Sequence, residues 1–144
     1  MPRNFVDVEG PIRTWLRGHA QLIPVFGSRI FFGTPRGGTT TPWITMTRVG
    51  GLPNLYTPED YPLIQMDVWG GIKDRAATAV AAYHLASVIE SASEKAPYYV
   101  GPVMIPAVAV VGFPRWLPDV DSDRARFVVQ VRFIVIARDQ VHVS

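Results

Sequence analysis

The chain has 144 residues, enough for a sizeable hydrophobic core, and we expect a single domain over residues 1–144. Hydrophobic residues make up 48% and charged residues 18% of the sequence, an ordinary globular balance, and the net charge of +2 argues against a general polyanion binder. The sequence contains no cysteine, which excludes disulfides, thiolate zinc sites and a catalytic cysteine.

No segment has the pattern of a signal peptide or a membrane span. The N-terminus lacks a long apolar run, and the longest apolar stretches, 103–111 and 127–137, are too short and too interrupted to cross a bilayer. We therefore expect a soluble protein. Its surplus of hydrophobic residues predicts either a large core or an apolar surface that a partner covers.

The first predicted element is a helix over about residues 8–23. Asp7 suits its N-cap and Pro11 its first turn, where a missing N–H costs nothing. Apolar residues then recur at helical spacing until Pro24, which is predicted to end the helix.

Two strands are predicted next, at 28–32 and 43–49, joined by the polar loop 33–42. The second strand alternates cleanly between apolar and polar residues and is rich in β-formers. Together they predict a hairpin with an extended tip.

A third strand is predicted over 61–69, ending at Gly70-Gly71. Its apolar residues Ile64, Met66 and Val68 fall on one face and a mixed set falls on the other, which indicates a sheet covered on one side only.

A second helix is predicted over 73–93, where many alanines favour helix formation and close packing on a sheet. Its expected buried stripe consists of Ala77, Val80, Ala81, His84, Leu85, Val88, Ile89 and Ala92.

The C-terminal third is predicted to be β-structure. Pro102 and Pro106 make 100–111 an edge or bulged strand, 113–123 reads as a loop, and 124–138 is the longest strand. The fold class expected is α+β, a mostly antiparallel sheet with two helices packed on one face, in the order α-β-β-β-α-β-β.

No motif for catalysis or cofactor binding emerges. The Gly-rich stretch 33–40 lacks the Gly-Lys-Ser/Thr ending of a phosphate loop and precedes a strand, so a hairpin tip with Arg36 at its crest is the better interpretation. The acidic stretch 119–123 lacks the glycine and distal glutamate of a calcium loop. The three histidines, at 19, 84 and 142, have neither ligand spacing nor a nucleophile motif beside them. We therefore expect no enzymatic activity and no bound metal or cofactor.

Tryptophans and arginines are the best candidates for contacts with partners, because tryptophan is costly to leave in water and arginine binds in a planar, bidentate manner. Symmetric repetition in a ring would turn a few arginines into a strong positive band. Core packing of the tryptophans and simple solvation of the arginines remain open alternatives. The candidates for partner contacts are Arg36, Trp43, Trp69, Arg115 and Trp116, and those for a DNA-facing lumen are Arg48, Arg124 and Arg126.

Over about residues 8–92 the chain resembles the tail terminator (tail completion) proteins of long-tailed bacteriophages. The similarity lies in the first helix, followed by Ser28-Arg-Ile-Phe-Phe-Gly-Thr-Pro35 and Thr41-Pro-Trp-Ile-Thr-Met-Thr-Arg-Val-Gly-Gly51. It continues in the strand ending Asp67-Val-Trp-Gly-Gly71 and in the alanine-rich helix Asp74–Ala92.

The resemblance implies a structural virion protein, assembled in the host cytoplasm and located at the head-tail junction. Such a protein forms a hexameric ring on the last ring of the tail tube, stops tube polymerisation and offers a docking face to the head-side connector. Viral DNA passes through its lumen without sequence-specific binding. The loops 33–42 and 112–124 and the edge strands are the expected contact regions.

Other functions remain open at this point. A neck or head-completion connector and a tail tube protein are alternatives of the same class. A small-ligand-binding or enzymatic α+β domain would require a deep pocket with converging polar groups. A DNA-binding module would require affinity for DNA that depends steeply on salt.

Overall fold

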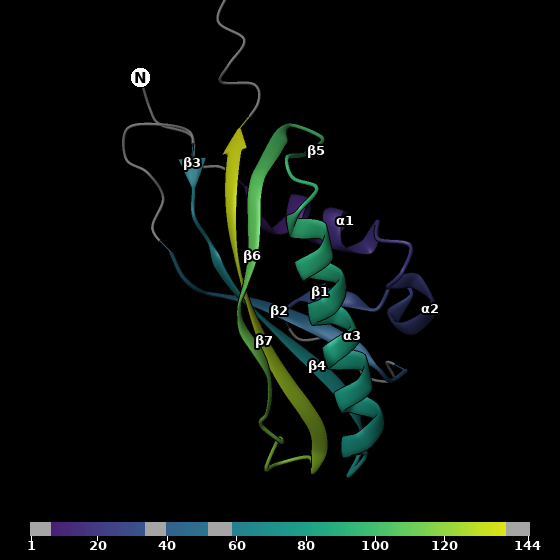
Figure 1. The fold of residues 1–144 in the computed structure, drawn as a ribbon. Helices are drawn as coiled ribbons and strands as arrows, with labels where there is room; N and C mark the ends of the chain where they lie inside the picture. Colours follow the sequence, from purple (N-terminus) through teal and green to yellow (C-terminus); the bar gives the residue numbers. More distant parts are fainter. Residues whose placement is uncertain (1–6, 34–39, 52–58, 138–144) are drawn as a thin grey trace, which may run out of the picture.

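A seven-stranded sheet forms the centre of the protein (Figure 1). The computed structural model describes residues 7–33, 40–51 and 59–137. Along the sheet the strand order is β1-β2-β4-β7-β6-β5, and β3 pairs with β7 beside this path. In chain order the elements are α1 (Glu9–Arg17), α2 (Ile23–Phe26), β1 (Ile30–Phe32), β2 (Trp43–Gly50), β3 (Glu59–Asp60), β4 (Leu63–Ile72), α3 (Arg75–Ser93), β5 (Tyr98–Val100), β6 (Val103–Trp116) and β7 (Arg124–Ala137).

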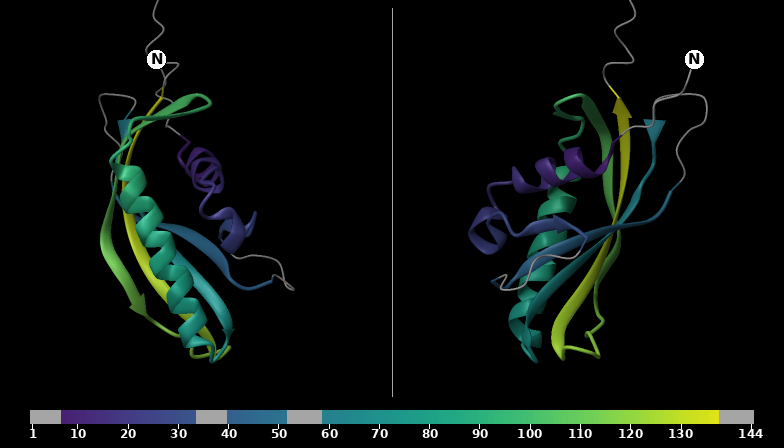
Figure 2. Two further views of the ribbon diagram at one scale, coloured as in Figure 1. Left: turned by 45° about the vertical axis from the view of Figure 1, so that its right-hand side comes forward. Right: turned by 180° about the vertical axis from the view of Figure 1, so that it is seen from behind.

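The helices α1 and α3 pack on one face of the sheet, which confirms the predicted α+β class (Figure 2). Among the described strands, every pair is antiparallel except β1–β2. The alternating residues Ile64, Met66 and Val68 of β4 are fully buried beneath the helices. On β7 the residues that share the same face of the sheet are also buried, namely Phe127, Val129, Val131, Phe133 and Val135. No described helix covers the opposite face, as the alternation predicts.

The predicted helix 8–23 is wrong in its extent. Helix α1 ends at Arg17, where Gly18 caps it and donates its N–H to carbonyls of the last turn. A separate short helix, α2, begins at Ile23. Pro24 lies in the first turn of α2 and does not end a helix, because proline is tolerated where no intrahelical N–H bond is made. The N-cap of α1 is Val8, without a side-chain cap.

The predicted hairpin is also wrong. Strand β1 pairs with β2 in parallel, with Ile30 opposite Ile44 and Phe32 opposite Met46. The connection after Phe32 therefore returns the chain to the same end of the sheet instead of turning it tightly. Residues 34–39 of that connection, including Arg36, lie outside the described residues.

Strand β4 does not end at Gly70-Gly71 but continues to Ile72. The glycine at 70 is required by packing, because a Cβ there would lie 1.7 Å from Oγ1 of Thr78 on α3. This contact orients α3 so that Thr78, Ala82 and Ala86 are buried. The predicted stripe was partly wrong: Leu85, Ile89, Ala81 and Ala92 are buried as expected, but Ala77 and Val80 are exposed.

Strand β6 is bulged, as its prolines predict, but it extends to Trp116 through a segment predicted to be a loop. Register shifts interrupt its pairing with β7 at three places. Strand β5 covers only Val103 to Ile105, so the remainder of β6 is an edge among the described strands. Val111 and Phe113 on this edge are exposed.

Candidate interaction surface on the open face of the sheet

Four residues predicted from sequence as interface or lumen candidates meet on the open face of the sheet. Trp43 on β2 and Trp69 on β4 are register partners, and their rings are stacked with centroids 6.1 Å apart and planes 15° apart. The guanidinium of Arg124 lies 5.1 Å from the ring of Trp43, and that of Arg126 lies 5.1 Å from the ring of Trp69. We call these four residues the Trp–Arg ladder.

The sequence places the ladder on this face by simple alternation. Ile44, Val68 and Ala125, which neighbour the ladder residues along the chain, are fully buried on the helix side. Alternate residues of a strand point to opposite faces, so the tryptophans and arginines point away from the helices.

Hydrogen bonds hold the ladder in place. The indole N–H of Trp69 donates to Oγ1 of Thr45 at 2.9 Å. Arg126 donates from Nε to the carbonyl of Leu117 at 2.8 Å, and Arg124 donates to the carbonyl of Gly70 at 3.2 Å. Both guanidiniums are therefore fixed by backbone acceptors as well as by the indole faces beneath them, which gives a preorganised cationic surface.

Asp67 lies next to the ladder and is buried, with 8% of its surface exposed. Burial raises the pKa of its carboxyl above the ordinary value, while the hydrogen bond from Gln65 and the nearby charge of Arg126 act in the opposite direction. The Gln65 amide donates to Asp67 at 3.0 Å, and Arg126 is 3.8 Å away. The ladder's positive charge is therefore only partly balanced from within.

Trp43 contributes an unused donor. Its ring is buried, and its Nε1 has no hydrogen-bond partner among the described residues. The guanidiniums of Arg124 and Arg126, which are partly exposed above the indoles, suit a partner that offers negative charge, such as a carboxylate-bearing surface or a phosphodiester backbone. No described side chain of the ladder is a nucleophile with a neighbouring base.

Arg48, the third lumen candidate, is not part of the ladder. It lies at the other end of β2 and forms a bidentate pair with Asp60, with N–O distances of 2.6 and 2.7 Å. It also donates to the carbonyls of Gly50 and Gly51. The hydrogen bond to Asp60 raises the pKa of Arg48. Its charge is thus used to fix the end of β2 against β3.

The two candidates at the end of β6 separate onto different faces. Trp116 is on the helix side, 5.2 Å from the ring of Phe127 and beneath the guanidinium of Arg75, 4.9 Å away. Arg115 lies opposite Val128 in the register and is exposed on the open face. Arg36, the remaining candidate, is outside the described residues.

Sequence reasoning missed Thr45, Gln65 and Asp67 as parts of this surface. The available signal was their spacing, since each is two residues from a ladder tryptophan or from another member on the same strand. Their convergence depends on the antiparallel register of β2 and β4, which places Thr45 opposite Asp67.

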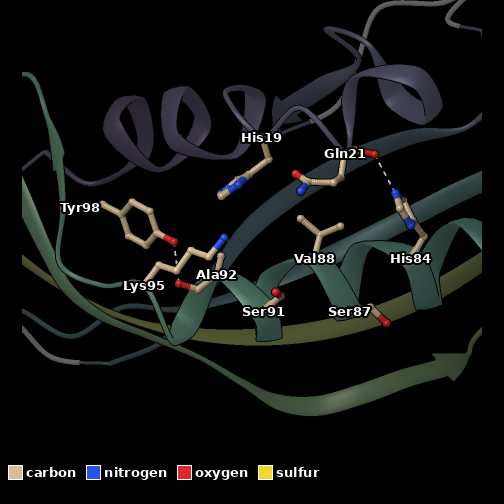
Figure 3. Close-up of a pocket in the computed structure, with 9 residues that line it drawn as sticks. All are labelled: His19, Gln21, His84, Ser87, Val88, Ser91, Ala92, Lys95 and Tyr98. Atoms are coloured by element: carbon tan, nitrogen blue, oxygen red, sulfur yellow. Dashed lines mark hydrogen bonds between the residues drawn. The ribbon is translucent and has the colours of Figure 1, made fainter.

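A pocket lies on the other side of the molecule, between the turn after α1 and the C-terminal half of α3 (Figure 3). It has a volume of about 300 Å³. Its walls include His19 and His84, whose approach the sequence did not predict, together with Lys95 and Tyr98. His84 Nε2 is 2.7 Å from the carbonyl oxygen of Gln21. Burial, and secondly the charge of Lys95, lower the pKa of His19.

The acidic stretch 119–123 forms a braced turn. Asp119 accepts hydrogen bonds from the N–H and hydroxyl of Ser122, which lower the pKa of its carboxyl. Within the described ranges, no group of three histidine or acidic residues is arranged to hold a metal ion. None of the described helices is long and apolar enough to cross a membrane.

The comparisons with known proteins identify the fold. No family model matches the chain, and no curated protein matches it. Eight solved chains match in structure. One of them, from a structure titled "Virion of native gene transfer agent (GTA) particle", has a TM-score of 0.68 and 13% identity. The match covers 90% of this chain and 95% of that chain, so the two share the same fold over nearly their whole lengths.

Proposed function

We propose that this protein is a non-enzymatic structural component of a phage-like virion that forms a hexameric ring on the end of the tail tube. The observation that carries the proposal is the match to a virion chain over 90% of this chain and 95% of the other. Because the match covers nearly all of both chains, the similarity extends over the complete fold and not over a shared fragment. The sequence resemblance to tail terminator proteins supports the finer role.

The exposed apolar residues support assembly with other copies or other virion proteins. At least half of the surface is exposed on four large hydrophobic residues, namely Val80 and Tyr83 on α3 and Val111 and Phe113 on β6. A ring needs a heterologous contact that closes, so two different surfaces of each copy must be covered. Termination of a tube also requires that one face of the ring binds the last ring of tube subunits and that the opposite face does not bind additional tube subunits.

The Trp–Arg ladder is our candidate for the lumen. Repetition around a ring would place Arg124 and Arg126 of every copy in one positive band that attracts the DNA backbone without reading its sequence. Arg48 is not included in this role, because Asp60 already balances its charge.

The capping role is tested with the purified chain and the tail tube protein from the same genome. Tube assembly is followed by electron microscopy with and without this chain. The expected result is short tubes with a ring at one end when the chain is present and long tubes of variable length when it is absent. Tubes of equal length in both cases, with no ring at the end, would contradict the proposal.

The same experiment separates two alternatives of the same class. A tail tube protein would form long tubes by itself. A neck or head-completion connector would form rings that leave tube length unchanged and bind capsids instead.

A small-ligand-binding function is a second candidate that one observation favours, namely the pocket beside His19 and His84. Its volume of about 300 Å³ is at the lower limit for small-molecule sites. A thermal-shift screen against metabolites tests it, and a saturable stabilisation by one chemical class would favour it over assembly.

A further inference from the structure

We propose that copies of this chain join head to tail by inserting the β6–β7 turn of one copy, at Val120 and Asp121, into the pocket beside Lys95 of the next. The inference rests on the proposed ring-forming function and names the contact that closes the ring. The turn and the pocket both consist of described residues.

The turn between β6 and β7 is a rigid projection. Asp119 binds Ser122 through its carboxylate, and the N–H of Asp123 donates to the carbonyl of Asp119 at 3.0 Å. Asp123 and Lys73 are the two described non-glycine residues with positive φ, at 61° and 58°. They contact each other through a backbone hydrogen bond of 3.1 Å and an ion pair of 3.6 Å. Backbone conformations with positive φ are unfavourable for residues other than glycine, so these two indicate that the surrounding contacts hold the turn in one shape.

The projection presents an unsatisfied surface. Val120 at its tip is 90% exposed, the highest value among the large hydrophobic residues described. Asp121 beside it is exposed, and its carboxylate has no hydrogen bond or ion pair among the described residues. A braced turn that exposes a valine and a free carboxylate is complementary to a site with an apolar floor and a cationic rim.

The pocket is such a site. Val88 and Ala92 contribute apolar surface, Lys95 contributes a positive charge at the rim, and no carboxylate is among the described residues that line the pocket. Lys95 is exposed and forms no ion pair among the residues that the structure describes. His19 Nε2 is buried and has no hydrogen-bond partner there. A volume of about 300 Å³ suits one or two side chains and is too small for a whole hairpin.

The position of the two parts makes the contact intermolecular. The turn contacts Lys73, two residues before α3 begins, whereas the pocket is lined by His84 to Ala92 in the C-terminal half of α3, by Lys95 just after it and by residues from other segments. In Figure 1 the turn between β6 and β7 lies at the same end of the molecule as the N-terminus of α3. An α-helix of this length extends over roughly 25–30 Å. The turn therefore cannot reach the pocket of its own chain. Two different surfaces at opposite ends of one helix are what a heterologous, repeating contact requires.

Charge reversal tests the contact. Lys95→Glu and Asp121→Lys are each expected to weaken self-association about tenfold or more, because each places like charges at every contact. Arg13→Glu, at an exposed position of α1 and with the same change in charge as Lys95→Glu, is the matched control for that variant and is expected to assemble like the wild type. Mass is measured by sedimentation across a concentration series, with and without tube ends, and folding by circular dichroism.

Two ways of combining these substitutions give a sharper test. The double variant Lys95→Glu/Asp121→Lys restores opposite charges at every contact, and so does an equimolar mixture of the two single variants, whose copies would alternate around the ring. Both are expected to recover most of the assembly. Rings that persist in the single variants would overturn this contact while leaving the capping role intact. A wild-type chain that remains monomeric even with tube ends would overturn the proposed contact as well. So would a loss of assembly that neither the double variant nor the equimolar mixture restores.

Discussion

Gly70 and Thr78 are in such close contact that a Cβ on the glycine would lie 1.7 Å from Oγ1 of the threonine and 2.9 Å from its Cβ. Thr78 is held there because its hydroxyl donates to the carbonyl of Asp74 at 2.6 Å. This contact fixes both the distance and the rotation of α3 relative to β4.

Gly70→Ala is therefore expected to destabilise the fold by about 2–3 kcal/mol, since the added methyl forces the helix away from the sheet. Urea unfolding measures the change. Gly71→Ala is the matched control, because a Cβ at that position would meet Asp74 at 3.7 Å, an ordinary contact distance. Equal losses for the two variants would show that the effect arises from the backbone and not from Thr78.

Removing the Arg48 guanidinium should be among the costly changes outside the core. Arg48→Met leaves the Asp60 carboxylate, which is 4% exposed, without its bidentate partner, and we expect a loss of about 3 kcal/mol. Adding Asp60→Asn should recover part of that loss, because the buried charge is then absent. Denaturant unfolding of the wild type, the two single variants and the double variant gives the coupling. A double variant no better than Arg48→Met would contradict the explanation.

The contacts within the Trp–Arg ladder should be measurable as a coupling between Trp69 and Arg126. A double-mutant cycle with Trp69→Leu and Arg126→Gln is expected to give about 1 kcal/mol, the size of a partly desolvated cation–π contact. The same cycle between Trp69 and Arg75, whose guanidinium lies over Trp116, serves as the control and should be additive within about 0.5 kcal/mol. Thermal unfolding measures all variants.

Asp67 predicts a specific pH dependence of stability. Burial raises the pKa of its carboxyl in the folded protein, so the folded state binds the proton more tightly than the unfolded state. Stability should therefore fall as pH rises from the ordinary pKa, about 4, through the raised folded value, and should be constant above it.

Asp67→Asn should remove that decline. The difference in unfolding free energy between the variant and the wild type is expected to shift in favour of the variant as pH increases across this window. Glu90→Gln, an exposed carboxyl on α3, is the control. A difference that is independent of pH would show that the effects of Gln65 and Arg126 cancel the effect of burial, and one that moves in favour of the wild type would show that they exceed it.

The sequence alone determined the elements whose pattern is local. The alternation of Ile64, Met66 and Val68 with Gln65, Asp67 and Trp69 established which face of β4 is covered, and the residues of β7 sorted onto two faces in the same way. Asp74 caps α3 with a side-chain hydrogen bond to the N–H of Ala77, one residue inside the predicted start of the helix. The α+β class follows from these local periods.

Only the tertiary structure decided the remaining features, because they depend on contacts between distant segments. Alanine lies on several sides of α3, so its pattern does not specify which side is buried, and Gly70 against Thr78 makes that choice. The parallel pairing of β1 depends on where the chain returns after Phe32. The Trp–Arg ladder assembles from three strands in register, and the pocket from two segments that are far apart in sequence. Local periodicity carries no information on such distances, since it records which face a residue occupies and not what lies opposite.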